Sequence, residues 1–150
     1  LHVRIGRLAQ TFGAGIARND NRVFAQFAKS IINKEDIILH TKGESARDYC
    51  YTTDAVRGLF FILMSGDDGE CYNVANEDTY CSIREIAEMF CREFNSNSHT
   101  VVQLKDGLGY SAPSKLKLST SKLRRLGWQP QLGLKEMFAR LIASLREEGE

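Results

Sequence analysis

Two spacings of hydrophobic residues divide the chain into predicted strands and helices. Apolar side chains near every second position predict a strand over His2–Ala9. Short apolar or extended runs predict four further strands, at 37–39, 47–51, 71–75 and 100–104. Apolar side chains three and four positions apart predict helices over 22–33, 53–65, 82–94, 120–127 and 134–146. Because strands and helices alternate, the pattern predicts an α/β fold.

Polar residues and glycines mark where these elements begin and end. The predicted helix caps are polar, at Arg18–Asn21, Thr53–Asp54, Ser82 and Ser119–Thr120. Ser82 and Glu85 have the spacing of a capping box, in which each side chain bonds the backbone of the other residue. The predicted turns and loops contain glycine, at 13–15, 42–45, 67–69 and 106–109.

The predicted helix over 53–65 is apolar on nearly all sides, with the run Leu59–Met64 at its centre. A helix of this kind normally lies between two layers of a protein. The scattered aromatic residues are interpreted as packing residues, at Tyr72, Tyr110, Trp128 and Phe138.

Composition and charge argue against a nucleic-acid-binding or membrane-spanning protein. The chain has 150 residues, 43% of them hydrophobic, and 20 basic against 19 acidic side chains. A formal charge of +1 provides no basic field for a nucleic-acid partner. The apolar run Leu59–Met64 is too short for a membrane span, so we expect no membrane partner. Four cysteines without the pattern of a disulfide framework add the expectation of a reducing cytoplasm. Because the chain starts at Leu1 inside a predicted strand, we expect a piece of a longer protein.

The spacing of cysteine and histidine residues indicates no metal site and no catalytic residue. The four cysteines form no C-x-x-C pair, and we expect structural thiols in a reducing compartment, with Cys91 buried in a helix. The three histidines have no arrangement that indicates a nucleophilic triad. Glu85 and Glu88 share a helix face beside arginines, which favours a solvated surface over an acid–base pair.

The segment 43–54 is the strongest candidate for binding chemistry. Arg47 follows a glycine turn and enters a strand, where a guanidinium is well placed to bind a phosphate with two hydrogen bonds. Tyr49 lies two residues later, on the same strand face, and is a candidate to stack on a base or sugar. The alternative is a weak surface ion pair of Arg47 with Asp48 or Glu44. Arg22, at a predicted helix start, is either an anion ligand or a solvated arginine.

The motifs together resemble the C-terminal portion of the extended short-chain dehydrogenase/reductases, the nucleotide-sugar epimerases and dehydratases. The most specific match is Gly43–Asp54 to G-x-x-x-R-D-[FY]-x-[YH]-V-x-D. The other matches follow in family order, with residues 7–15 similar to R-x-x-N-x-Y-G-P-G, 20–27 to D-x-R-V-x-x-x-F, 69–74 to G-E-x-Y-N-V, 82–87 to S-I-x-E-[IL]-A and 121–130 to S-K-[AL]…L-G-W-x-P.

The resemblance implies the C-terminal portion of an NAD(P)-binding Rossmann-type protein, in which this chain contributes the substrate-binding part. The family's NAD fingerprint G-x-x-G-x-x-G and its catalytic Y-x-x-x-K are both missing from this sequence. The resemblance therefore implies that the NAD-binding half lies outside residues 1–150 and that this part alone is inactive. It implies C4 oxidation of a nucleoside-diphosphate sugar, but does not separate epimerase, dehydratase and decarboxylase.

The resemblance also implies substrate-binding roles for individual residues. Arg47 would grip the diphosphate beside Tyr49, and Arg22 and Val23 would enter a helix near the nucleotide. Gln10 stands where the family has a substrate-contacting asparagine, and Lys117 stands near a phosphate-binding arginine. Asp54 would cap its helix.

The resemblance also carries expectations for assembly. We expect a homodimer for the full-length enzyme and self-association of the isolated chain through apolar faces that its missing half would cover. The alternative function is a non-catalytic module that binds sugar nucleotides.

Overall fold

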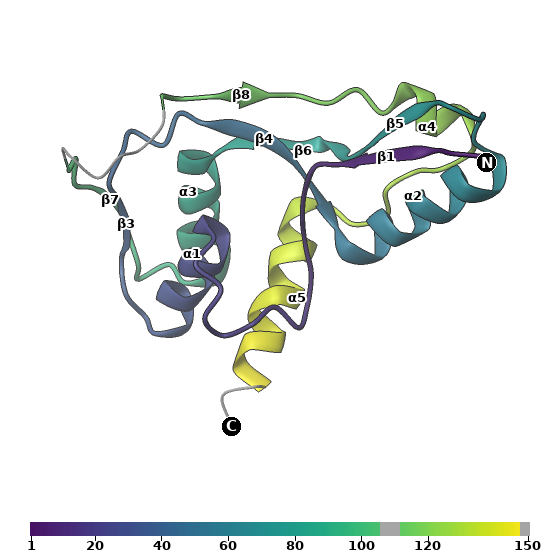
Figure 1. Ribbon diagram of the computed structural model, residues 1–150. Coiled ribbons are helices and arrows are strands. Elements are labelled where there is room, and N and C mark those ends of the chain that lie inside the picture. The colour runs from purple at the N-terminus through teal and green to yellow at the C-terminus, as the bar shows by residue number, and fades with distance from the viewer. Residues whose placement is uncertain (106–111, 148–150) are drawn as a thin grey trace. The chain divides into compact units, whose positions relative to one another are not determined.

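The computed structural model describes residues 1–105 and 112–147, so the expected loop at 106–109 and Tyr110 lie outside the described residues. The described elements, in chain order, are β1 (Ile5–Leu8), β2 (Gln10–Phe12), α1 (Val23–Ile32), β3 (Ile37–Leu39), β4 (Ala46–Tyr51), α2 (Thr52–Ser65), β5 (Cys71–Val74), β6 (Asn76–Ser82), α3 (Ile83–Phe94), β7 (Thr100–Val102), β8 (Lys115–Leu116), α4 (Ser121–Arg125) and α5 (Leu134–Glu147) (Figure 1). The α/β fold expected from the alternating pattern is confirmed. No helix in the described ranges is both long and apolar enough to cross a bilayer.

The chain forms two compact units, and each is made of segments that are distant in sequence. The first contains Leu1–Gly13, Arg47–Tyr80 and Leu116–Met137, and the second contains Ala14–Ala46, Cys81–Lys115 and Phe138–Glu150. The strands pair into three sheets with the orders β1-β5, β2-β4-β6 with β8 beside β4, and β3-β7. The pairs β1–β5, β2–β4 and β3–β7 are parallel.

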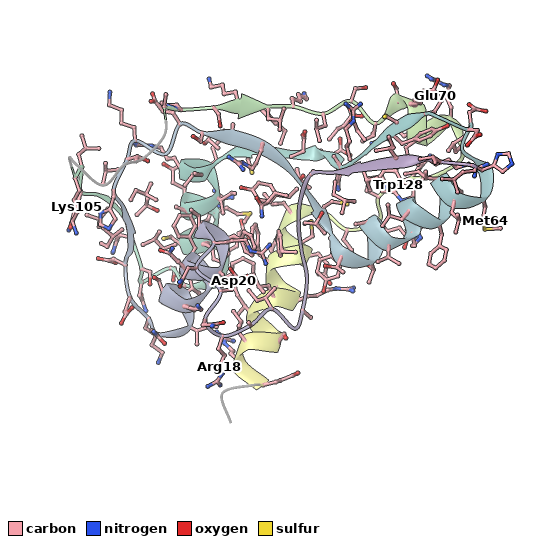
Figure 2. The ribbon with its side chains drawn as sticks, in the orientation of Figure 1. Arg18, Asp20, Met64, Glu70, Lys105 and Trp128 are labelled. Carbon is pink, nitrogen blue, oxygen red and sulfur yellow. The ribbon has the colours of Figure 1, made fainter. Side chains whose placement is uncertain are left out.

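The core of the first unit lies between α2, α4 and the pair β1–β5. Trp128 and Tyr72 are almost fully buried there, beside Val74 and Leu123. Figure 2 shows Trp128 inside this unit, next to α2. Gly58 of α2 allows this close packing, because a Cβ at that position would lie 2.9 Å from the Val74 side chain. The predicted packing roles of Tyr72 and Trp128 are confirmed.

The core of the second unit is aromatic and joins α1, α3 and α5. The Phe90 ring packs edge-on against Phe138 at a centroid distance of 4.6 Å and against Phe27 at 6.2 Å. Cys91 is buried on the inner face of α3, as expected for a structural thiol. The amphipathic patterns predicted these three helices because each presents one apolar face to this core.

The strand expected over His2–Ala9 is confirmed as β1, which starts later, at Ile5. After it, Ala9 donates its backbone N–H to the Val74 carbonyl at 2.9 Å, and the chain continues into β2, which was not predicted. Three residues are too few for alternation to detect β2, which is held by its pairing with β4. The strands β6 and β8 also escape the hydrophobic pattern, because their residues are largely polar and are held by pairing with β4.

Two of the four predicted helix caps are wrong in position, because the N-caps of α1 and α2 are Arg22 and Tyr51. At α4 the predicted Thr120 is the N-cap, but among the described residues its side chain makes no capping bond. The Thr120 hydroxyl instead donates to Glu77, and the Asp54 carboxylate, inside the first turn of α2, accepts bonds from another segment. The capping box of Ser82 and Glu85 at α3 is confirmed.

The outer face of α2 is exposed, in contrast to the expected position between two layers. Exposed fractions rise along the helix from 40% at Leu59 through 58% at Phe60 and 64% at Leu63 to 81% at Met64. Figure 2 shows Met64 pointing away from the unit at the end of α2. Within the described residues, only the face that contains Ala55, Gly58 and Ile62 is covered.

Candidate functional site

The candidate site is centred on β4, which follows a tight turn. Gly43 has a φ of +70°, a conformation that side-chain-bearing residues rarely adopt, so the predicted glycine turn is confirmed. A Cβ at Gly43 would also lie 2.9 Å from the backbone nitrogen of Arg84. The turn thus leads the chain closely past the start of α3 and into β4.

Pairing with β2 brings three of the predicted site residues together. The parallel register places Gln10 opposite Tyr49, and Arg47 lies two residues before Tyr49 on the same strand. Because directly opposed residues and residues two apart share one face of a sheet, Gln10, Arg47 and Tyr49 lie on one face. We call this group the Arg47 face.

Tyr49 is a packed residue of the Arg47 face. Its exposed fraction is 5%, and its ring meets the Phe12 ring edge-on at a centroid distance of 6.2 Å. Its backbone is held by Thr79, whose hydroxyl oxygen accepts from the Tyr49 N–H at 2.8 Å. The single hydroxyl hydrogen of Thr79 has the Asn76 carbonyl at 2.6 Å as its nearer acceptor and the Tyr49 carbonyl at 3.0 Å as its more distant one. Tyr49 therefore provides a rigid base for the neighbouring Arg47.

Arg47 is half-buried on this face. Within residues 1–105 and 112–147, neither Glu44 nor Asp48 forms a salt bridge with its guanidinium. The alternation of β4 directs Asp48 to the opposite face, where it is 1% exposed. The guanidinium thus keeps its charge unpaired among the described carboxylates, as an anion ligand requires.

Asp48 is an unusual carboxylate. Its Oδ2 atom accepts a hydrogen bond from the Leu118 N–H, whereas its buried Oδ1 atom has no hydrogen-bond partner among the described residues. Burial raises the pKa of Asp48, and the nearby Glu77 carboxylate raises this pKa further, while the Leu118 N–H and the Lys117 ammonium oppose the shift. Sequence reasoning treated Asp48 only as a possible surface partner of Arg47, because no sequence signal reports its contact with Leu118.

Lys117 lies with Asp48 instead of with the Arg47 face. Its ammonium is 5.4 Å from the centre of the Tyr80 ring, and its charge acts on the carboxylates of both Asp48 and Glu77. The side chain is exposed, but its charge is partly offset by these two carboxylates. The described geometry therefore does not group Lys117 with Arg47.

Arg22 and Val23 belong to the second unit, at the start of α1. The Arg22 guanidinium binds the Asp20 carboxylate through Nε at 2.9 Å and Nη2 at 2.6 Å, and lies 4.7 Å from the centre of the Phe24 ring. The hydrogen bond from the Arg22 side chain lowers the pKa of Asp20, with a weaker opposing effect of burial. Val23, the first residue of α1, is exposed. The charge of Arg22 is thus partly neutralised by Asp20, two residues earlier in the chain.

Among the described residues, the thiols and acidic groups form no reactive centre. Burial raises the pKa of the Cys50 thiol to about 12, which makes it a poor nucleophile. All four cysteines are free. In the part of the chain that the structure describes, no three His, Cys, Asp or Glu side chains gather as metal ligands.

Comparison with known proteins shows the family. The sequence profile of the NAD dependent epimerase/dehydratase family matches residues 1–75, half of the chain. The chain therefore belongs to the NAD dependent epimerase/dehydratase family, as the motifs of the sequence predicted.

Curated relatives are longer than this chain. UDP-glucuronic acid decarboxylase 1 from Arabidopsis thaliana is 29% identical over 147 residues, covering 97% of this chain and 33% of that protein. UDP-glucuronic acid decarboxylase 1 from Xenopus tropicalis is 27% identical over 150 residues, covering 100% of this chain and 35% of the relative. The chain spans about a third of the length of these relatives, and it matches their C-terminal part.

Solved structures show the same fold. The UDP-glucose 4-epimerase of Thermotoga maritima, solved with UDP-glucose, superposes with a TM-score of 0.83 at 22% identity, covering 100% of this chain and 48% of that chain. A dTDP-glucose 4,6-dehydratase from Streptomyces venezuelae, solved with NAD, gives a TM-score of 0.77 at 23% identity, covering 98% and 44%. The fold is therefore that of a Rossmann-type extended short-chain dehydrogenase/reductase.

Proposed function

We propose that this chain is the substrate-binding part of an NAD-dependent nucleotide-sugar epimerase, dehydratase or decarboxylase. The observation that carries the proposal is the Arg47 face: Gln10, Arg47 and Tyr49 converge on one face of β2 and β4 in a member of the epimerase/dehydratase family. The relatives that are UDP-glucuronic acid decarboxylases support a nucleoside-diphosphate sugar as the ligand. For the full-length enzyme we propose a homodimer in the cytoplasm.

Arg47 is the proposed ligand of the diphosphate. A guanidinium donates two parallel hydrogen bonds to phosphate oxygens, and half-burial strengthens them relative to bonds in water. Gln10, on the neighbouring strand, offers an amide to a sugar or phosphate oxygen. Tyr49 is the packed residue that supports these two side chains. The other predicted contacts are weaker candidates for substrate binding: Arg22, Val23 and Lys117. Arg22 and Lys117 already lie near carboxylates, which offset part of their charge.

The residues of this chain do not fit an NAD site. A dinucleotide fingerprint needs glycines that join a strand directly to a helix, but Gly13–Gly15 is separated from α1 by several residues. In addition, Gly13 is buried against Thr52, where a Cβ would lie 2.7 Å from the hydroxyl oxygen. We therefore propose that NAD and the catalytic Y-x-x-x-K residues belong to a part of the protein outside these 150 residues.

Replacement of Arg47 tests the proposed site. In the full-length protein, Arg47→Ala removes a charge-assisted, two-bonded contact, so the binding of UDP should weaken by about 1.5–3 kcal/mol, or about 10–150-fold. Isothermal titration with UDP measures the effect. Arg125→Ala is the matched control, because Arg125 is an exposed arginine of α4 and lies outside the Arg47 face. Equal UDP affinity in the Arg47 variant and the control would remove Arg47 from the site.

A turnover assay separates the enzyme from the alternative, a non-catalytic sugar-nucleotide-binding module. The full-length protein is incubated with UDP-glucuronate or UDP-glucose and NAD, and products are separated by chromatography. Epimerised, dehydrated or decarboxylated product supports the enzyme. Tight UDP binding without conversion of either sugar nucleotide would favour the module.

A further inference from the structure

The segment 118–120 is held by side chains from three different strands. The Leu118 N–H donates to Asp48 of β4, the Ser119 carbonyl accepts from Asn73 of β5 at 2.8 Å, and the Thr120 N–H donates to Glu77 of β6 at 2.7 Å. Three consecutive residues of one segment are thus fixed by side chains. We call the residues Asp48, Asn73 and Glu77 the clasp.

The Asp48 member of the clasp acts on the strand that carries the Arg47 face. Asp48 lies between Arg47 and Tyr49 in sequence, and its side chain points to the opposite face of β4. The hydrogen bond from Leu118 to Asp48 therefore holds β4 on the face opposite the Arg47 face, at the position between Arg47 and Tyr49. Thr79 also contacts this stretch of backbone, because its hydroxyl oxygen accepts from the Tyr49 N–H.

Burial of the Asp48 carboxylate costs free energy that an apolar packing residue at this position would not cost. The carboxylate is 1% exposed, one of its oxygens has no partner in the described ranges, and the Glu77 carboxylate acts on it from β6. The Lys117 ammonium is the cation that opposes this repulsion. An apolar side chain would avoid the desolvation cost at this position but would leave the Leu118 N–H without its acceptor.

We propose that Asp48 is a positioning residue for nucleotide binding, which holds Arg47 and Tyr49 in their binding geometry through its bond to Leu118. The inference rests on the proposed function, since it needs Arg47 as the diphosphate ligand. A guanidinium that is already held in its binding geometry loses less conformational entropy when it binds a phosphate. If the Asp48–Leu118 bond is lost, β4 becomes more mobile, and nucleotide affinity falls although Arg47 is still present.

Two Asp48 variants separate positioning from charge. Asp48→Ala removes the acceptor of the Leu118 bond, so UDP should bind about tenfold more weakly to the full-length protein. Asp48→Asn keeps a carbonyl acceptor and removes the negative charge, so its UDP affinity should return to that of the unmodified protein. If only charge mattered, both variants would bind the anionic UDP more tightly, and by similar factors.

Asp54→Ala is the matched control, because Asp54 is also 1% exposed and also accepts backbone N–H bonds from a distant segment. It should lower the melting temperature but leave UDP affinity unchanged, whereas Asp48→Ala should lower both. Affinities are compared at a temperature at which circular dichroism shows every variant folded. Equal losses of affinity in Asp48→Ala and Asp54→Ala would reduce Asp48 to a structural role and overturn the proposal.

A second pair of variants serves if Asp48→Ala does not fold. Thr79→Val removes the acceptor of the Tyr49 N–H together with the hydroxyl donor that faces the Asn76 carbonyl, and Thr79→Ser retains the hydroxyl. Weaker UDP binding in the valine variant, with recovery in the serine variant, supports the proposal that contacts on the opposite face of β4 position Arg47. Unchanged UDP binding in the valine variant, or in Asp48→Ala, overturns it. No UDP binding by the unmodified protein would instead overturn the proposed function, and the positioning role with it.

Discussion

At the scale of single residues, buried polar side chains connect the C-terminal segments of the first unit to its strands and helices. Asp54 is the clearest case, since its carboxylate accepts from the backbone of Gln131 at 2.9 Å and of Leu132 at 3.1 Å, and from Arg57 at 3.0 Å. Its own carbonyl accepts from the Trp128 indole at 3.1 Å. One aspartate thus anchors the loop that follows α4.

Asp54→Ala should lower the free energy of unfolding by about 2–4 kcal/mol, because two backbone donors and Arg57 lose their acceptor. The full-length protein is unfolded in urea and the transition of the first unit is followed by the fluorescence of Trp128, the sole tryptophan in this chain, with other tryptophans replaced where needed. Asp78→Ala, at an exposed position of β6, is the control and should stay within about 0.5 kcal/mol. A loss no larger than that of the control would show that the loop does not depend on Asp54.

At the scale of elements, helices were easier to predict than strands. The start of α3 is set by local chemistry: the Ser82 hydroxyl accepts from the Glu85 N–H at 3.2 Å, and the Glu85 carboxylate accepts from the Ser82 N–H at 2.7 Å. All of these atoms lie within one turn, so the sequence contains the whole signal. The short strand β2 is held by pairing with the distant β4, and therefore it escaped the sequence pattern.

The capping box predicts a pH dependence for the second unit. The hydrogen bond from the Ser82 backbone is the main cause that lowers the pKa of Glu85 below its ordinary value of 4.5. Because the folded-state pKa is the lower one, the stabilisation is complete above the unfolded value and is lost as the pH falls through the folded value. Glu85→Gln should therefore be less stable than the unmodified protein at neutral pH, and the difference in urea midpoint should shrink as the pH falls below about 4.5.

The matched control for this prediction is Glu88→Gln, at an exposed position on the same helix. Its midpoint difference should stay near zero across the same pH range. A Glu85 difference that stays constant from neutral to acidic pH would show that the carboxylate charge contributes nothing to the cap.

At the scale of the whole molecule, the chain leaves apolar surface uncovered. The outer face of α2 exposes Leu59, Phe60, Leu63 and Met64, and the adjacent β1 exposes Ile5 and Leu8. Within the described residues β1 pairs only with β5, and a parallel sheet is ordinarily covered on both faces by other layers. The chain spans about a third of the length of its curated relatives, and we propose that a part of such a protein outside these 150 residues covers this surface.

We propose that the isolated 150-residue chain self-associates through this surface. Its molar mass in solution, measured by light scattering, should rise with concentration. Leu63→Glu should lower the association because it places a charge in the centre of the exposed face of α2. Ser65→Glu, which adds the same charge at an exposed polar position of the helix, should change it little. A folded monomer of the unmodified chain at all concentrations would contradict the proposal.

The sequence by itself determined the α/β class, the family and most helices, and it predicted Gln10, Arg47 and Tyr49 as site residues, which the pairing of β2 with β4 then placed on one face. These follow from local signals, since helical spacing, capping pairs and motif order are contained in short stretches of chain. Only the tertiary structure showed that Asp48 bonds Leu118, that Lys117 lies beside Asp48 and that Arg22 binds Asp20. It also decided which face of α2 is covered. The first two contacts and the covering of α2 depend on segments far apart in sequence, and the Arg22–Asp20 pair depends on the conformation of its turn, so no hydrophobic period or short motif specifies them.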